Sequence, residues 1–216
     1  MVEIARSTSD RGEIWLGRRS DGALELRVNG VFVMDDRETR SEELLATAAL
    51  EAYTATGLTV LVGGLGLGYT VRALLKDPRV QRIIVAEIEP DLVQWMRDGL
   101  IPSVLDDERV EVQPGDVRDI VGQQPGQSLD GILLDVDNGP DFLVYEGNSA
   151  IYESEFLATC RSALKPSSGV LTVWSSSHSD HLARAMATTY DESRVRPVPV
   201  ELQGRDETYY VYQGSS

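Results

Sequence analysis

Residues 58–70 read LTVLVGGLGLGYT, an apolar run that breaks into glycines at positions 63, 64, 66 and 68. A short apolar run bounded by glycine predicts a buried strand, and the helix formers that follow, YTVRALLKD, predict a helix. In open α/β sheets the first turn from strand to helix is where a nucleotide comes closest to the backbone. The glycines therefore indicate a ligand site, although tight turns also collect glycine for structural reasons alone.

The rest of the chain repeats this alternation of strand and helix. Apolar strand-like runs at 82–89, 109–116, 130–137 and 169–175 are separated by helical patterns, as in PDLVQWMRDGL and SEFLATCRSALK. Two further strand-like runs, RVRPVPVELQ and ETYYVYQG, predict an antiparallel hairpin at the sheet edge. The pattern predicts the α/β class, with a mostly parallel seven-stranded sheet and helices on both faces.

The N-terminal segment has a different pattern. Residues 13–34 alternate in short stretches around Asp21-Gly22 and Asn29-Gly30, dipeptides that close hairpins. We expect a small β-hairpin unit over residues 1–40. Ser41 is the expected N-cap of a helix that stops at Gly57, and residues 41–216 form the expected ligand-binding domain.

Composition narrows the function classes. The 216 residues are 42% hydrophobic, enough for a core, and carry a formal charge of −15 with scattered Lys and Arg. This charge predicts that nucleic acid is not a partner. The sequence has one cysteine, Cys160, no recognisable signal segment and no apolar run long enough for a bilayer. We therefore expect a soluble cytoplasmic protein without a membrane partner.

Acidic residues follow two further strands of the predicted sheet. Glu87 ends the strand after the glycine turn, where a carboxylate can accept hydrogen bonds from ribose hydroxyls, and Glu89 is a reserve candidate. Asp116 ends the next strand and can accept from an adenine amino group. The alternative is that these are solvated loop carboxylates. Tyr69 stands where a dinucleotide fingerprint has its third glycine, which favours S-adenosylmethionine over a pyrophosphate ligand.

The stretch VLVGGLGLGYTVRALLKDPRVQRIIVAEIEPDLV, residues 60–93, resembles the first two motifs of the spermidine synthase family. Residues 22–50 and 129–171 are similar to that family's N-terminal segment and catalytic loop. The resemblance implies a Rossmann-like methyltransferase fold, S-adenosylmethionine or its decarboxylated form as the cofactor, and a homodimer. It places Asp135 at the catalytic aspartate position. It also implies a set of donor-binding residues: Gly63, Gly64, Gly66, Gly68, Glu87, Asp116 and Asp135.

Three departures from the family pattern concern amine recognition. The family's Tyr-His-Glu group is replaced by Arg40, Ser41 and Glu42, and the spacing after Asp135 differs. Leu65 or Leu67 stands where the family's glycine turn usually has an aspartate. We therefore favour a methyltransferase acting on a small molecule. The alternatives are an aminopropyltransferase that uses the decarboxylated donor, transfer or cyclisation of the donor's aminobutyryl chain, and a non-catalytic nucleoside-binding protein.

Three residues are candidates for catalysis. Transfer from a sulfonium needs an uncharged nucleophile, so a carboxylate near an amine can accept its proton, and Asp135 and Asp137 are placed for this role. Alternatively, Asp135 is a helix cap and Asp137 belongs to an ordinary turn. His178 is a further candidate base. His181 follows it by three positions, but no third ligand with suitable spacing is apparent, so no metal site is expected.

Overall fold

A small antiparallel sheet forms the N-terminal part of the chain in the computed structural model, which describes residues 1–215. Its strands β1 (Val2–Ser9), β2 (Gly12–Arg18), β3 (Leu24–Val28) and β4 (Val31–Asp35) pair in chain order. Asn29 and Gly30 adopt positive φ values of 52° and 76°, the conformation that a two-residue hairpin turn requires. The unit has one strand more than the two predicted turns imply. This strand, β1, was not predicted because it is largely exposed and lacks an apolar alternation.

The main sheet has seven strands in the order β10-β11-β9-β8-β5-β6-β7. The parallel strands are β5 (Leu58–Gly63), β6 (Val80–Glu87), β7 (Val110–Pro114), β8 (Gly131–Leu134) and β9 (Val170–Ser175). The strands β10 (Glu192–Leu202) and β11 (Arg205–Ser215) form the antiparallel hairpin at one edge. The predicted fold class, including this hairpin, is confirmed.

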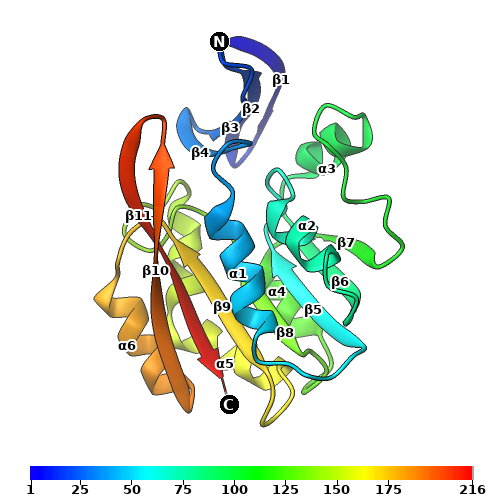
Figure 1. Ribbon diagram of the computed structural model, residues 1–216, viewed down its shortest axis with the longest axis vertical. Helices are drawn as coiled ribbons and strands as arrows, with labels where there is room; N and C mark the ends of the chain where they lie inside the picture. Colours follow the sequence, from blue (N-terminus) through cyan, green and yellow to red (C-terminus); the bar gives the residue numbers. More distant parts are fainter. Residues whose placement is uncertain (216) are drawn as a thin grey trace.

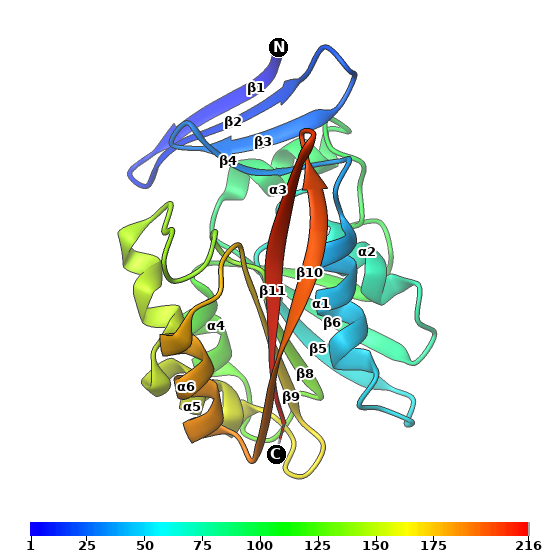
Figure 2. The same ribbon diagram turned by 60° about the vertical axis from the view of Figure 1, so that its left-hand side comes forward.

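Helices cover both faces of the main sheet (Figure 2). On one face lie α1 (Arg40–Leu50), α2 (Tyr69–Leu75) and α3 (Pro90–Arg97); on the other lie α4 (Val117–Gln123), α5 (Ser154–Ala163) and α6 (Asp180–Thr189). A 3₁₀ helix, η1 (Glu146–Tyr152), precedes α5. Thr39 rather than Ser41 occupies the N-cap position of α1, and the helix ends at Leu50, well before Gly57, so its predicted bounds are wrong.

Two apolar cores lie on the two faces of the main sheet. Val60 and Val62 of β5 contribute to the core under α1 to α3, and Leu61 contributes to the core under α4 to α6. This alternation follows from the two-residue period of a strand. Leu16 and Leu26 of the N-terminal sheet join the first core, so this sheet packs against the main unit.

The parallel strands β5, β6, β7 and β8 end at the same edge of the main sheet. The N-terminal sheet lies across this end of the molecule (Figures 1 and 2). Residues that follow the strand ends therefore face the underside of the small sheet. Within residues 1–215, no helix has the length and apolar character needed to cross a membrane.

Candidate active site

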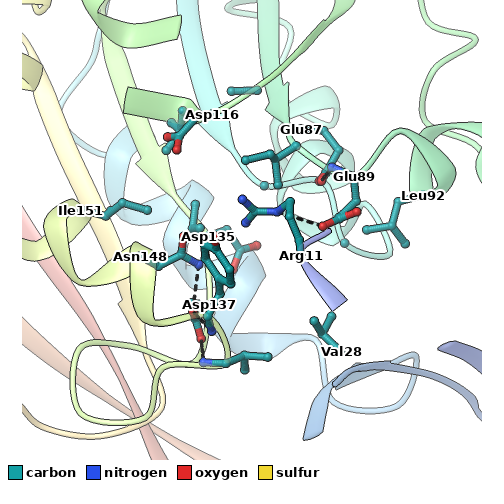
Figure 3. Close-up of a pocket in the computed structure, with 18 of the residues that line it drawn as sticks. Arg11, Val28, Glu87, Glu89, Leu92, Asp116, Asp135, Asp137, Asn148 and Ile151 are labelled. Carbon is teal, nitrogen blue, oxygen red and sulfur yellow. Dashed lines mark hydrogen bonds and ion pairs between the residues drawn. The ribbon is translucent and has the colours of Figure 1, made fainter. Parts of the chain in front are cut away.

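A cavity of about 140 Å³ lies at the carboxyl ends of the parallel strands (Figure 3). Its walls come from three sources: the strand ends, the N-terminal sheet and the loop after β8. The predicted site residues that line it are Gly64, Gly66, Glu87, Asp116, Asp135 and Asp137. Gly63, Gly68 and His178 are not among its wall residues.

The glycine turn allows close approach of other parts of the same chain. Gly64 has φ +90°, and a Cβ atom there would lie 2.2 Å from the carbonyl oxygen of Asp135. Gly66 has φ +49°, and its Cβ would lie 2.6 Å from Sδ of Met34. Both conformations favour glycine. Because Gly64 and Gly66 lack side chains, the turn after β5 can approach Asp135 and Met34 closely. Both glycines also line the cavity.

The other two glycines pack against apolar side chains. A Cβ at Gly63 would lie 2.7 Å from Cγ2 of Val117, and one at Gly68 would lie 3.2 Å from Met96 and Val104. Gly68 adopts a left-handed conformation as the N-cap of α2. The structure gives these two glycines a packing role, and their predicted contact with a donor stays a prediction.

Glu87 joins the glycine turn to the end of β6. One carboxylate oxygen accepts from the backbone N–H of Leu65 at 2.7 Å, and the other accepts from that of Glu89 at 2.7 Å. Burial raises the pKa of Glu87, and the two backbone hydrogen bonds oppose that shift. Each oxygen keeps a further lone pair, so the carboxylate can also accept from two vicinal hydroxyl groups.

Arg11 is a wall residue that the sequence did not predict. It belongs to the turn between β1 and β2, and its Nε donates to Oε1 of Glu89 at 3.0 Å. Its guanidinium carbon lies 4.2 Å from the centroid of the Tyr145 ring. Arg11 thus links the N-terminal sheet to the start of α3, through Glu89, and to the loop after β8, through Tyr145, at the wall of the cavity (Figure 3).

Asp116 follows β7 and caps α4. Its carboxylate accepts from the backbone N–H of Arg118 at 2.9 Å and forms an ion pair with the guanidinium of the same residue at 2.6 Å. This guanidinium holds the pKa of Asp116 below its usual range. The carboxylate is therefore ionised and oriented beside the cavity, where it can accept a hydrogen bond from a ligand amino group.

Asp135 directly follows β8. Its backbone N–H donates to the carbonyl of Gly63, and its Oδ2 accepts from Thr70 Oγ1 at 2.6 Å. Burial raises the pKa of Asp135 to about 6, while the Thr70 hydroxyl opposes the shift. A carboxylate with this pKa is a base that exchanges a proton near neutral pH.

A second cavity, of about 50 Å³, adjoins the first and shares Gly66, Asp135 and Asp137 with it. Glu42 of α1 and Trp174 of β9 are among its other wall residues. Glu42 is 5% exposed and accepts from the hydroxyl of Ser41 at 2.6 Å. Burial, with the nearby charge of Asp135, raises the pKa of Glu42 to about 8. Neither Glu42 nor Asp135 forms a salt bridge within residues 1–215.

Asp137 organises the loop after β8. One carboxylate oxygen accepts from the backbone N–H groups of Asn138 and Val144, and the other accepts from the backbone of Tyr145 and the amide of Asn148. These four hydrogen bonds occupy the lone pairs of the carboxylate. Proton acceptance by Asp137 would break this network, so the geometry favours a role in holding the loop; the predicted catalytic role remains untested.

His178 lies apart from both cavities. Its ring is 46% exposed, lies 3.7 Å from Asp180 and packs edge-to-face against Tyr210. Its predicted role as a base stays a prediction. Residues 1–215 contain no cluster of three or more His, Cys, Asp and Glu side chains arranged to hold a metal ion.

Curated relatives share most of this chain. The polyamine aminopropyltransferase of Nitrosomonas europaea is 34% identical over 177 residues, which are 77% of this chain and 51% of the relative. Polyamine aminopropyltransferase 2 of Pseudomonas aeruginosa is 29% identical over 72% of this chain and 46% of the relative. The chain thus spans about half the length of these relatives. No family model matches it.

Solved structures share the fold. A spermidine synthase in complex with the transition-state analogue AdoDATO superposes with a TM-score of 0.85 and 20% identity, covering 99% of this chain and 73% of that one. The spermidine synthase of Thermotoga maritima gives a TM-score of 0.81 and 19% identity, covering 99% and 72%. The fold is therefore that of these spermidine synthases. The chain is thus spermidine synthase-like, as the motifs predict.

The preference for a methyltransferase is wrong, because the curated relatives are named polyamine aminopropyltransferases. Two of the residues on which that preference rested lie away from the site. Leu65 and Leu67 are 4% and 1% exposed, pack in the core and line neither cavity. Glu42, the third member of the Tyr-His-Glu position, is present and lines the second cavity.

Proposed function

We propose that this protein transfers an aminopropyl group from decarboxylated S-adenosylmethionine to a small amine. The observation that carries the proposal is the pair formed by Glu42 and Asp135, two acidic side chains without a salt-bridge partner in residues 1–215. The pair lies beside the first cavity, whose walls carry the further acidic residues Glu87 and Asp116. Burial raises the pKa of both groups, and the positive charges of a decarboxylated donor would stabilise their ionised forms. The names of the curated relatives support the same activity.

The larger cavity would hold the nucleoside of the donor. Glu87 would accept from the ribose hydroxyls and Asp116 from the adenine amino group, and the backbone of Gly64 and Gly66 would lie against the sulfonium end. Decarboxylation of the donor suits this site. An intact donor would place its carboxylate near Asp135, where like charges repel.

The transfer step follows from the position of Asp135. The acceptor amine approaches as a neutral molecule, and its nitrogen attacks the propyl carbon that is bonded to sulfur. A C–N bond forms as the C–S bond breaks, and methylthioadenosine leaves with the electron pair of that bond. Asp135 accepts the proton released by the new ammonium, with its orientation fixed by the Thr70 hydroxyl.

Asp137 would act through the loop that it holds. Its hydrogen bonds fix the backbone at Val144 and Tyr145, both of which line the donor cavity. This places the loop over the donor without requiring Asp137 to exchange protons. His178 is the next candidate base to test if Asp135 proves dispensable for turnover.

A homodimer is also proposed. β1 is an edge strand of the N-terminal sheet, and the side chains of Val2 and Phe142 are 68% and 63% exposed. Edge strands and exposed apolar side chains are surfaces that a second copy can cover. Light scattering at micromolar concentration should give twice the monomer mass, and a monomer mass would contradict this part of the proposal.

The activity is tested by incubating the protein with decarboxylated or intact S-adenosylmethionine, each with and without a panel of small amines. We expect consumption of the decarboxylated donor that depends on the amine, together with release of methylthioadenosine. Calorimetry with both donors separates binding from turnover. Tight donor binding without turnover on any amine would favour a non-catalytic nucleoside-binding protein.

A further inference from the structure

Met34 of β4 lies in the wall of the second cavity and contacts the glycine turn. Its Sδ accepts a hydrogen bond from the backbone N–H of Leu67 at 3.2 Å. The same sulfur fills the space beside Gly66, because a Cβ atom on Gly66 would lie only 2.6 Å from it. Gly66 lines both cavities, so the end of the Met34 side chain lies beside a residue that the two cavities share.

The surroundings of Met34 restrict a side chain that is usually adaptable. Methionine is unbranched and has three rotatable bonds, so it can move aside for a ligand where nothing holds it. Met34 is only 9% exposed and packs in the first core. Its sulfur is also held by the backbone of Leu67 and packed against Gly66. We therefore expect Met34 to form a fixed part of the cavity wall.

The second cavity is small for an amine acceptor. Its volume is about 50 Å³, and a water-sized group needs about 10–15 Å³, so it has room for about four non-hydrogen atoms. The apolar part of its wall consists of Val33, Met34 and Trp174, and the Trp174 ring packs edge-to-face on Tyr209 with centroids 4.9 Å apart. Asp135 lies in the same wall. An amine whose reacting nitrogen lies at Asp135 can therefore extend into this cavity by only a few methylene groups.

We propose that Met34 sets the length of the acceptor by filling one side of the second cavity, and that the protein therefore selects short-chain amines. This inference rests on the aminopropyl transfer proposed above. Replacement of Met34 by alanine removes Cγ, Sδ and Cε and leaves space for a longer chain. Replacement by leucine keeps a side chain of similar volume. Acceptor length should therefore follow the volume of the side chain at position 34.

The test compares diaminopropane, putrescine and cadaverine, which carry the same two terminal amino groups and differ only in the number of methylene groups. For each amine, kcat/KM of Met34→Ala is divided by that of the parent protein, so differences in basicity among the amines cancel. We expect this ratio to rise by about tenfold or more from diaminopropane to cadaverine, the scale of one methylene in an apolar pocket. The ratio should lie below one for diaminopropane, because a short chain leaves part of the enlarged cavity empty, and above one for cadaverine.

Two further variants serve as controls. Met34→Leu should keep the parental order of the three amines, because it keeps the volume of the side chain. Met186→Ala is the matched control for loss of a buried methionine, since Met186 is 1% exposed, belongs to the core under α4 to α6 and lines neither cavity. Its ratios should be equal for all three amines. Met34→Val, which shortens the side chain less, replaces Met34→Ala if that variant does not fold.

Two results would overturn the inference: equal ratios for the three amines in Met34→Ala, or a parent protein that uses cadaverine better than diaminopropane. If no amine is turned over, the same ratios are formed from association constants measured by calorimetry on the complex with methylthioadenosine. Ratios that rise with amine length would then support the role of Met34 while counting against the transfer reaction. Equal ratios, or no binding of any of the three amines, would contradict the acceptor site itself.

Discussion

Replacement of Asp135 by asparagine keeps the size of the side chain and its hydrogen bond to Thr70 but removes its ability to accept a proton. The amide oxygen can still accept from Thr70, which now donates over 2.6 Å, and the side-chain volume is nearly unchanged. The amide cannot accept a proton from the acceptor amine. Asp135→Asn should therefore keep the donor affinity within about threefold and lower the turnover number by about 10²-fold or more, the usual contribution of a positioned base.

That loss corresponds to about 2.7 kcal/mol of transition-state stabilisation, since each decade in rate is about 1.4 kcal/mol. The pH profile gives a second readout. Because the pKa of Asp135 is raised to about 6, turnover by the parent protein should rise as the pH increases through about 6. Asp135 and Glu42 interact, so the apparent value belongs to the pair. If Asp135→Asn retains some turnover, that turnover should not show the rise near pH 6, which we call the acid limb of the profile.

The assay is single-turnover release of methylthioadenosine under excess enzyme, with donor affinity measured by calorimetry. Thr70→Val is the companion variant, since it keeps the carboxylate but removes the hydroxyl that lowers its pKa. We expect its acid limb to move to higher pH. If Asp135→Asn turned over at the parental rate, or lost donor binding and turnover equally, the assignment of Asp135 as the base would be refuted.

Four further variants test the other parts of the site. Glu87→Ala should weaken donor binding by about 1.5–3 kcal/mol in calorimetry, and Glu111→Ala, in an exposed ion pair with Arg82, should leave it unchanged. Gly64→Ala should lower the free energy of unfolding by about 2 kcal/mol or more, because its Cβ would lie 2.2 Å from a carbonyl oxygen, against about 1 kcal/mol for Gly30→Ala, whose Cβ would contact nothing within 4 Å. Glu42 has its pKa raised from 4.5 to about 8, so the folded state keeps a proton that the unfolded chain releases, and stability falls as the pH rises through this window. Glu42→Gln should make the fall between pH 6 and 8 shallower, where Asp135 with its pKa of about 6 contributes least, and equal slopes of stability against pH for both proteins would contradict it. Asp137→Asn should speed amide hydrogen exchange at Val144 and Tyr145, and unchanged protection there would show that the carboxylate does not hold the loop.

The main sheet could be predicted because its strands are nearly continuous apolar runs separated by helical patterns. Buried parallel strands produce such runs by necessity, since both of their faces are covered. The first strand, Val2–Ser9, is largely exposed and carries no comparable signal. Ser41 resembled an N-cap in the sequence, but its hydroxyl bonds to Glu42 inside the molecule, and Thr39 holds the cap position.

The candidate site was predictable where residues follow strand ends. Glu87, Asp116 and Asp135 meet at one edge because parallel strands end together. Arg11 could not be found in this way, since it reaches Glu89 across 78 positions of sequence from a turn without a motif. Trp174 could not be found either, since a tryptophan in a buried strand has the same local pattern whether or not it lines a cavity.

The central claim is that the propyl chain, rather than the methyl group, leaves the donor sulfur. It is tested most directly with decarboxylated S-adenosylmethionine that carries an isotopic label in the propylamine chain, incubated with the protein and an amine acceptor. Mass spectrometry should find the label in the acceptor and unlabelled methylthioadenosine as the nucleoside product. A labelled nucleoside that retains the propyl chain, together with a methylated acceptor, would contradict the account.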